Sequence, residues 1–523
     1  MSTRFKKAFK NCEYFDYSKD ENKNPMLEAI AKVKSEFGKQ YPMIIGKGKL
    51  QFTSDENTIK SYNPSSKNEL IGIVSKGNSS HAEDALEEAS RAFETWKRVP
   101  LEKRIDVMLK ARQLLIQRRH EFNAYCVLES GQIWNEADGE VAEAIDFLDF
   151  YSRHAERLLR KQRVTKKSDE DGFVQNIPLG VGAVIPPWNY PCAILAGLII
   201  APVVAGNTVV VKPASDTPVI GYKFVELLEQ AGLPPGVVNF VPGSGKEVGE
   251  YLVNSPKTRF VAFTGSRDVG LHIYESLAKP QEGQIWLKRL IAEMGGKNAH
   301  IIDSEADLES AVLGTMQAAF GRQGQRCSSC SRAIVDEKVY EKFVEMLVEK
   351  TKQWKVGPSE DLANNMGPVI NYEAFNKIIG YMARGIDEGR LVLGGFGNPT
   401  KGYFIHPTIF ADVSPDAEMA NEEIFGPVLA VIKAKDFDDA LRIANNTEYG
   451  LTGAVYSQNE AKLEKAVQDF HVGNLYLNRK CTGAMVGVHP FGGFNHSGTD
   501  SKTGGPDYVM LFLQAKTIGR KVR

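Results

Sequence analysis

Short strand-like segments alternate with helical segments twice along the chain, and this alternation limits its possible folds more than any other feature. The first series has β-rich residues 181–187, 207–213, 237–243 and 259–265, with helical segments such as 222–230 between them. The second series starts near Leu290 and has strand-like residues 298–303, 331–336, 391–395, 404–410, 429–434 and 453–457 among helical residues 306–320, 339–354 and 437–445. Such alternation indicates βαβ units and parallel sheets. We therefore predict an α/β protein with two α/β domains that join near Glu293.

The remaining segments predict peripheral elements. Apolar residues three and four positions apart predict three long amphipathic helices over residues 82–96, 101–131 and 136–160. Residues 1–80 predict irregular structure with a hairpin around Met43 to Ile73. The charged segment 161–173 is either a solvated loop or an exposed hairpin used in assembly. The C-terminal segment 507–523 is typical of one or two strands, has no partner nearby in sequence, and could add to the sheet of another subunit.

Charge and cysteine content exclude several classes of partner. The 523 residues carry 64 basic and 65 acidic side chains, a formal charge of -1, so they lack the cationic excess that a nucleic-acid-binding surface needs. Six cysteines are too sparse for a disulfide scaffold and suit a reducing compartment. The longest apolar stretch, Cys192 to Gly206, is short for a membrane span and contains Pro202, and no secretory signal is readable. We expect a soluble, cytoplasmic protein with no nucleic-acid or membrane partner.

Glycine-rich turns follow two of the predicted strands, although the dinucleotide-binding pattern GxGxxG is absent. Gly243, Gly245 and Gly249 follow one strand, and Gly265, Ser266 and Gly270 follow another. Such turns let a pyrophosphate approach backbone N–H groups at a helix start, although tight turns alone also explain many of these glycines. Lys212 ends a third strand, at the sheet edge where these folds bind ligands. Lys246 is followed by Glu247 rather than Ser or Thr, which argues against an ATPase loop.

Cys327 and Cys330 form a CxxC pair on a glycine-flanked segment. Such a pair can bind zinc or form a redox disulfide, but zinc needs further ligands and no second closely spaced pair is present. We therefore expect no metal. The remaining interpretations are a dithiol redox site, an inert buried thiol, and a catalytic nucleophile.

Seven ordered motifs resemble those of the aldehyde dehydrogenase superfamily: PPWNYP, VVVKPAS, FTGS, AEMGGK, GQRCSSCSR, NEEIFGP and PFGG. The resemblance covers most of the chain and implies a Rossmann-like cofactor domain, a catalytic domain and a small β oligomerisation element. The implied boundaries are 1–157 for the N-terminal part of the cofactor domain, 158–173 for an oligomerisation hairpin, 174–291 for the NAD-binding part, 292–483 for the catalytic domain, 484–505 for a return to the cofactor domain with the substrate loop, and 506–523 for an oligomerisation strand.

The resemblance implies three catalytic residues. Cys327 matches the nucleophilic thiol, which attacks an aldehyde carbon to give a thiohemiacetal and then, after hydride transfer, a thioester. Asn189 matches the amide of the oxyanion hole, where fixed donors stabilise the developing alkoxide. Glu293 matches the general base that activates the hydrolytic water, a task that a raised pKa would help near neutral pH.

The resemblance also implies a nicotinamide cofactor. The matching positions are Pro187, Trp188, Lys212, Ser215, Gly245, Gly249, Phe263, Gly265, Ser266, Glu423 and Phe425. Ser215 stands where many NAD-preferring relatives carry Glu, whose charge would repel a 2′-phosphate. We therefore expect NAD and keep NADP as an alternative.

A narrower resemblance, carried by EADGEVAEAIDF, CSSCSR and the segment 473–508, is to the L-glutamate γ-semialdehyde dehydrogenases of proline breakdown. It implies oxidation of L-glutamate 5-semialdehyde, an aldehyde with an amino-acid head group, to glutamate. The substrate-binding positions are Ser328, Gly483, Ala484, Phe491 and Tyr190, of which Tyr190 replaces the usual Phe. Members of this superfamily usually form dimers or larger assemblies, so the resemblance implies a homo-oligomer. The alternatives are another semialdehyde or aliphatic aldehyde dehydrogenase, and an inactive relative that serves as a binding or structural protein. Cys330 suggests that a disulfide with Cys327 could inactivate the enzyme under oxidation.

Overall fold

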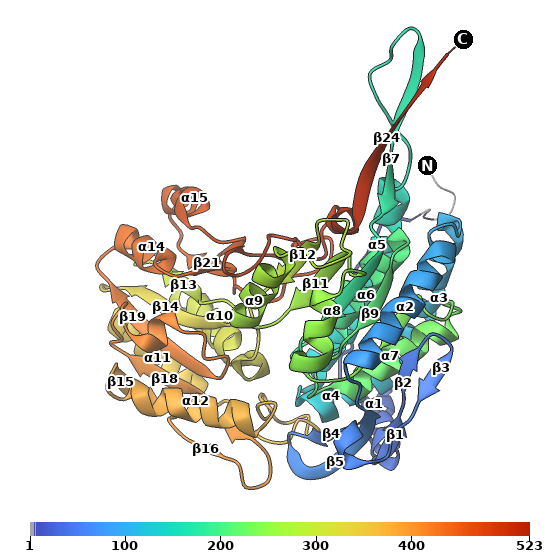
Figure 1. Cartoon of the computed structure of the whole chain (residues 1–523). Coiled ribbons are helices and arrows are strands. Elements are labelled where there is room, and N and C mark those ends of the chain that lie inside the picture. Colours follow the sequence, from blue (N-terminus) through green and yellow to red (C-terminus); the bar gives the residue numbers. More distant parts are fainter. Residues whose placement is uncertain (1–4, 6, 523) are drawn as a thin grey trace.

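Two seven-stranded sheets form the centres of two lobes, and a narrow antiparallel arm projects from the body (Figure 1). The structure is a computed structural model that describes residue 5 and residues 7–522. Between the two sheets the chain crosses once at residues 294–297, after β12 (Arg289–Glu293) and before β13 (Asn298–Ile302). Within the described residues, no helix is both long and apolar enough to cross a membrane.

The sheet of the first lobe has the strand order β12-β11-β8-β9-β10-β2-β3. Its further strands are β2 (Met43–Ile45), β3 (Gly48–Leu50), β8 (Val181–Ile185), β9 (Thr208–Val211), β10 (Val238–Phe240) and β11 (Phe260–Thr264). Strands β8 to β12 pair in parallel, as the alternation of strands and helices predicts, and β2 and β3 extend the edge antiparallel. Alternate side chains of β9 enter two different cores: Val209 and Val211 pack on one face and Val210 on the other. Both faces are therefore buried, which explains the nearly continuous apolar strands.

Helices cover both faces of this sheet. One face packs against α2 (Ser79–Trp96), α8 (Glu250–Asn254) and α9 (Arg267–Leu277). The other packs against α6 (Ala193–Ala205) and α7 (Pro218–Gln230), on which α3 (Leu101–Gln117), α4 (Arg119–Ser130) and α5 (Trp134–Leu158) form an outer layer. The single helix predicted over residues 101–131 is wrong, because the backbone leaves the helical conformation at Arg118 (φ -102°, ψ 16°) and α3 ends there. Both halves keep an apolar face, so the periodicity continues across the break.

The second lobe repeats this plan with the strand order β15-β18-β19-β14-β13-β21-β22. Its further strands are β14 (Cys330–Asp336), β15 (Arg390–Leu393), β18 (Thr408–Ala411), β19 (Val428–Ala434), β21 (Thr452–Tyr456) and β22 (Asn474–Leu477). Helices α10 (Leu308–Phe320) and α11 (Tyr340–Thr351) cover one face. The other face packs against α12 (Tyr372–Gly385), α13 (Glu418–Asn421), α14 (Phe437–Asn445) and α15 (Glu460–Asp469). Only β15 is antiparallel, so the prediction of a second parallel α/β unit is confirmed.

The N-terminal region is more regular than the sequence predicts. It contains α1 (Asp20–Ser35), where irregular structure is expected, and a three-stranded sheet of β1 (Lys39–Tyr41), β4 (Thr58–Asn63) and β5 (Ser66–Ser75). The expected hairpin around Met43 to Ile73 is two hairpins, β2–β3 and β4–β5. Pro25 lies within α1 and only three of its residues are buried, so its helical pattern is weak.

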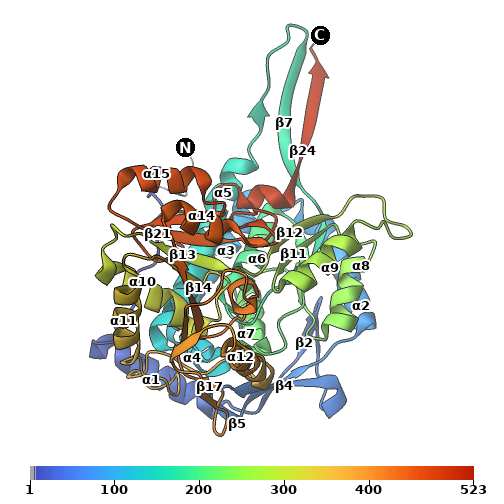
Figure 2. The same ribbon diagram turned by 90° about the vertical axis from the view of Figure 1, so that its left-hand side faces the viewer.

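The projecting arm is a three-stranded antiparallel sheet of β6 (Gln162–Arg163), β7 (Glu170–Pro178) and β24 (Leu513–Lys521) (Figures 1 and 2). The C-terminal strand does have a partner in its own chain: β24 pairs with β7 from Leu513↔Pro178 to Lys521↔Glu170. The charged segment 161–173 contributes β6 and the start of β7, so it is not simply a loop. Strand β24 is at the edge of the arm, where its outer side has no strand partner among the described residues.

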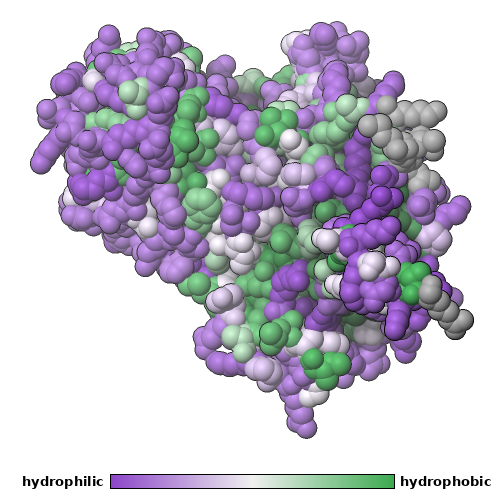
Figure 3. Space-filling view, turned by 90° about the horizontal axis from the view of Figure 1, so that it is seen from above, coloured by the Kyte–Doolittle hydropathy of each residue, from purple (hydrophilic) through white to green (hydrophobic). Residues whose placement is uncertain are grey.

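Two small two-stranded sheets lie outside the two large ones. The two-stranded sheets are β16 (Gly397–Asn398) with β17 (Phe404–Ile405) and β20 (Tyr449–Gly450) with β23 (Phe494–Asn495). Seen from above, hydrophobic residues gather in the middle of the molecule, whereas the outer surfaces of the lobes are mainly hydrophilic (Figure 3).

Candidate active site

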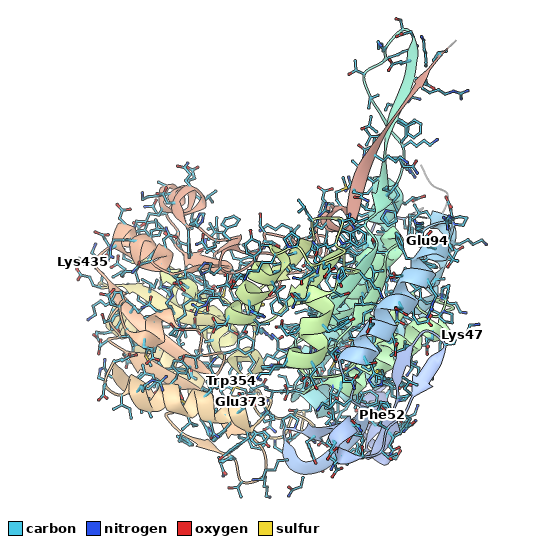
Figure 4. The ribbon with its side chains drawn as sticks, viewed as in Figure 1. Lys47, Phe52, Glu94, Trp354, Glu373 and Lys435 are labelled. Carbon is cyan, nitrogen blue, oxygen red and sulfur yellow. The ribbon has the colours of Figure 1, made fainter. Side chains whose placement is uncertain are left out.

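The three predicted catalytic residues come from three different chain segments at the boundary between the lobes. Glu293 is the last residue of β12, and Asn189 follows β8 in the same sheet. Cys327 precedes β14 in the other sheet. Glu373, at the start of α12, also lies near this boundary (Figure 4). The carboxyl ends of parallel strands carry the ligand sites of α/β folds, and the first two residues follow that rule.

Two cavities meet at Cys327, which lines both of them. The first, of about 230 Å³, is lined by Pro187, Trp188, Asn189, Thr264, Gly265, Ser266, Met294, Gly295, Cys327, Ala374, Lys377, Ile378, Glu423, Ile424 and Phe425. The second, of about 90 Å³, is lined by Glu143, Phe147, Tyr190, Ile194, Glu293, Cys327, Ser328, Gly483, Ala484, Met485, Val486, His489, Phe491, Thr503 and Gly504. The Cys327 thiol therefore lies between two cavities. This position would let it react with a molecule bound in one cavity while a second molecule is bound in the other.

Asn298 holds the loop that presents the cysteine. Its side-chain amide donates to the backbone carbonyls of Cys327 (2.6 Å) and Ser329 (2.9 Å), while its oxygen accepts from the Thr452 N–H (3.0 Å). Just before the loop, Arg322 and Gln323 have positive φ angles of 52° and 56°. Such strained backbone persists only when its surroundings fix it. The sulfur position is therefore set by the second sheet rather than by the loop alone.

Glu293 and Cys327 form an acid–base pair. Burial raises the pKa of Glu293 to about 7, against which the hydrogen bond from the Cys327 thiol acts. Burial also raises the pKa of the thiol well above its usual value, and the Glu293 charge raises it further. One carboxyl oxygen of Glu293, Oε1, has no hydrogen-bond partner among the described residues. The carboxyl can therefore accept a proton near neutral pH and has a free acceptor for water.

Asn189 is held by a buried charged network. Its side-chain amide donates to the backbone carbonyl of Gln325 (3.0 Å), and the backbone carbonyl of Asn189 accepts from the Arg322 guanidinium (2.8 Å). Arg322 pairs with Glu140 of α5 (3.1 Å) and stacks over the Tyr190 ring at 3.7 Å. The network ties α5, the loop after β8 and the cysteine segment together, so the amide beside Cys327 has little freedom to turn.

Only part of the predicted cofactor set lines the first cavity. Pro187, Trp188, Gly265, Ser266, Glu423 and Phe425 do so. Trp188 and Phe425 meet edge to face at 5.5 Å, and Glu423 accepts from the Gly296 N–H (2.9 Å). The remaining predicted cofactor residues do not line this cavity: Lys212, Ser215, Gly245, Gly249 and Phe263. A Cβ built on Gly265 would meet the Phe263 ring at 2.6 Å, so Phe263 packs beneath that turn rather than into the cavity.

Lys212 and Gly249 lie together outside the first cavity. A Cβ on Gly249 would be 3.7 Å from Lys212 Cδ. Burial lowers the pKa of Lys212 to about 8, and Asp216 is the charge that opposes this. Ser215 is exposed, but Asp216 beside it accepts from Asn371 of the second lobe (2.8 Å). An acidic group is therefore present near Lys212, one residue after the position expected from the sequence.

All five predicted substrate residues line the second cavity: Ser328, Gly483, Ala484, Phe491 and Tyr190. Gly483 has a φ of +81°, in the region that favours glycine, which fixes the turn of this loop. The cavity also contains Glu143 of α5, which the sequence analysis missed. Burial, and next the charge of Glu140, raises the pKa of Glu143 to about 8.

A sequence signal for Glu143 and Glu140 does exist. Glu136, Glu140, Glu143 and Phe147 lie three or four positions apart, so they share one face of α5, and acidic residues on a face that is otherwise apolar indicate a buried polar site. Arg322 and Asn298 have no comparable signal, because their partners are distant in sequence.

Cys330 is separated from the site. It is 1% exposed and packs in the core of the second lobe with Cys481, and its thiol donates to the Arg332 carbonyl (3.4 Å). Cys327 instead faces the two cavities. All six cysteines are free thiols. A disulfide between Cys327 and Cys330 would require the second thiol to leave this core.

Comparison with known proteins gives a family match and near full-length relatives. Residues 52–518 match the model described as "Aldehyde dehydrogenase family". The chain is 55% identical over 510 residues to a protein of Geobacillus thermodenitrificans named 1-pyrroline-5-carboxylate dehydrogenase, which covers 98% of both sequences. A protein of the same name from Geobacillus kaustophilus is 56% identical over 503 residues, 96% of this chain and 97% of the other.

Solved structures resemble the whole chain. The 1-pyrroline-5-carboxylate dehydrogenase from Thermus with bound NAD has a TM-score of 0.97 and 47% identity, over 99% of each chain. The proline utilization A protein of Bdellovibrio bacteriovorus has a TM-score of 0.96 and 44% identity, and the match covers 98% of this chain but 53% of that one. The two-lobed α/β architecture predicted from the sequence is confirmed by these structures.

Proposed function

Because the chain belongs to the aldehyde dehydrogenase family, we propose that it oxidises L-glutamate 5-semialdehyde to L-glutamate with reduction of NAD, as a step of proline breakdown. The substrate forms when the ring of 1-pyrroline-5-carboxylate opens by addition of water. Support comes from the name shared by the relatives, from the NAD bound to the Thermus structure, and from the two cavities that meet at Cys327.

Cys327 is the proposed nucleophile. Its sulfur adds to the aldehyde carbon, so that a C–S bond forms and the carbonyl oxygen becomes an alkoxide. The side-chain amide of Asn189 and the N–H of Cys327 would donate to that oxygen, and the Arg322 network holds Asn189 for this task. The thiol proton goes to Glu293, its hydrogen-bond partner.

The first cavity fits a nicotinamide cofactor. The aromatic rings of Trp188 and Phe425 form an apolar wall, and Glu423 offers a carboxylate to ribose hydroxyls. NAD bound there would accept the hydride that leaves the thiohemiacetal carbon, which becomes a thioester on Cys327. Lys212 and the turn at Gly249 would hold the far end of the dinucleotide, and Asp216 nearby would disfavour a 2′-phosphate.

Glu293 is the proposed base for the second half of the reaction. Its free Oε1 would take a proton from a water that attacks the thioester carbon; the C–S bond then breaks, and the thiol and a carboxylate are released. A pKa of about 7 lets the same group hold and release protons near neutral pH. Its position beside the sulfur explains why one carboxyl can serve both steps.

The second cavity explains the choice of substrate. Backbone N–H groups of Gly483 and Ala484, with the Ser328 hydroxyl, would bind the substrate's carboxylate by directed hydrogen bonds. Burial raises the pKa of Glu143 to about 8, so this carboxyl would ionise and pair with the ammonium group when the substrate brings that positive charge beside it. Phe491 and Phe147 would pack on the methylene groups between.

One observation carries this proposal: Glu143 and the turn at Gly483 and Ala484 line the same cavity as Cys327, so groups suited to an amino-acid head group lie in the space that the thiol faces. The test is to incubate the protein with 1-pyrroline-5-carboxylate and NAD and to measure L-glutamate and NADH. The proposal requires equal amounts of both. Formation of neither product, or of NADH without glutamate, would contradict the proposal.

We also propose that the arm assembles copies of the chain into a dimer or larger homo-oligomer, in the cytoplasm. The open outer edge of β24 supports assembly, because an unpaired strand edge readily pairs with another strand. The sparse free cysteines support a reducing compartment.

A further inference from the structure

A segment near the N-terminus, residues 9–17, lies along α5. Its backbone N–H groups at Cys12 and Phe15 donate to Asp146 (2.8 Å) and Asp138 (2.7 Å) of that helix. The Phe9 ring meets Phe150 edge to face at 5.0 Å. Asp138, Asp146 and Phe150 are eight and four positions apart, so they lie on one side of α5. The segment therefore follows the helix for about three turns.

The same helix forms a wall of the substrate cavity. Glu143 and Phe147, which line that cavity, are on α5 between or beside the residues that hold the N-terminal segment. A shift or rotation of α5 would move both side chains relative to Cys327. The N-terminal segment is thus packed along the helix that forms one wall of the cavity.

Asn11 connects this wall to the opposite one. Its side-chain amide donates to Asp146 Oδ2 (2.9 Å) and to the carbonyl of Val486 (2.9 Å). Val486 lines the cavity and lies two residues after Ala484, in the loop that would bind the carboxylate. One NH₂ group thus joins the helix that carries Glu143 to the loop that carries Gly483 and Ala484. The Asp146 carboxylate and the Val486 carbonyl are both acceptors, so they need such a donor between them.

We propose that Asn11 is a positioning residue for substrate recognition: by holding α5 and the 483–486 loop at a fixed separation, it keeps the ammonium-binding and carboxylate-binding groups at the spacing of one amino-acid head group. This inference rests on the proposed function. Asn11 itself does not line the cavity, so it acts through Asp146 and Val486. The aldehyde-reacting groups Cys327, Asn189 and Glu293 are held by other contacts, so they do not depend on it.

The inference predicts a selective defect. In Asn11→Ala, KM for 1-pyrroline-5-carboxylate should rise roughly tenfold, because the two groups that bind the head group lose their fixed spacing, while kcat changes less than about twofold. With butyraldehyde, which has no head group, kcat/KM should stay within about twofold of wild type. Asn11→Asp, which keeps the shape but replaces the donor with an acceptor, should be at least as impaired.

Asn22→Ala is the matched control. Asn22 is also near the N-terminus and its amide also donates to a carbonyl, that of Asp16 (3.1 Å), but the contact stays within that region. Asn22→Ala should leave kcat and KM for both substrates unchanged. NAD affinity, measured by fluorescence titration, reports folding of every variant. An equal loss on both aldehydes, or an unchanged KM for 1-pyrroline-5-carboxylate in both Asn11 variants, would overturn the inference. A wild-type enzyme that does not prefer 1-pyrroline-5-carboxylate would instead contradict the proposed function.

Discussion

The Cys327 thiol and the Glu293 carboxyl are hydrogen-bond partners with opposite effects on each other. The carboxylate raises the pKa of the thiol, whereas the thiol's hydrogen bond opposes the rise that burial gives the pKa of Glu293. The proton therefore stays on sulfur while the carboxyl ionises first. This order supports the proposed role of Glu293 as the group that would take the thiol proton during attack on the aldehyde.

The pKa of Glu293, about 7, predicts the pH dependence of turnover. A base works only when deprotonated, so kcat should rise with pH through about 7 and level off above it. Glu293→Gln should remove this dependence and slow thioester hydrolysis more than acylation. Rapid mixing should then show about one NADH formed per site, followed by slow turnover. A variant that keeps the wild-type pH profile would contradict the role of Glu293.

Glu143 should determine preference for an amino-acid head group. Glu143→Gln removes the carboxyl that can ionise when an ammonium group binds beside it, so kcat/KM for 1-pyrroline-5-carboxylate should fall about tenfold or more, since a charge-assisted hydrogen bond is worth about 1.5–3 kcal/mol. For butyraldehyde, kcat/KM of Glu143→Gln should equal that of the wild-type protein. Glu156→Gln, also on α5 but outside the cavity, is the control. Equal effects of the two variants would contradict the assignment.

The buried pair of Arg322 and Glu140 should be important for stability, because the two side chains are only 3% and 0% exposed. Arg322→Met leaves the Glu140 carboxylate without its countercharge and should lower the free energy of unfolding by about 3–5 kcal/mol. Adding Glu140→Gln should recover part of this loss. Chemical denaturation measures the free energy of unfolding of both variants. A loss below about 1 kcal/mol in Arg322→Met would mean that water solvates this network.

The arm should control assembly. Deletion of residues 515–523 removes most of β24, the strand whose outer edge would pair with another copy of the chain. Analytical ultracentrifugation should show a dimer or larger for the full chain and a smaller species for the deletion. Val467→Ser, an exposed position on α15 away from the arm, should not change the sedimentation. Identical sedimentation of all three proteins would contradict assembly through the arm.

Both α/β units could be predicted from sequence because buried parallel strands and amphipathic helices leave local patterns, as around Val209–Val211 and in α10. The break between helices α3 and α4 at Arg118 could not be predicted, because the spacing of apolar residues continues across it. The motifs identified Cys327, Glu293 and Asn189 as candidate catalytic residues, and the structure shows that all three lie at the boundary between the lobes. Contacts such as Asn298 to Cys327 and Asn11 to Val486 join residues 29 and 475 positions apart, so only the folded chain reveals them.

We propose that the aldehyde derived from 1-pyrroline-5-carboxylate is oxidised by NAD while it is bound covalently to Cys327. The most direct test compares kcat/KM, by NADH formation, for 1-pyrroline-5-carboxylate, succinate semialdehyde and butyraldehyde, in wild type and Cys327→Ser, with NADP in a parallel series. The account predicts a preference for 1-pyrroline-5-carboxylate with NAD, and a loss of at least about 1000-fold in Cys327→Ser, which lacks the thiol nucleophile. A preference for either other aldehyde, or full activity of Cys327→Ser, would contradict it.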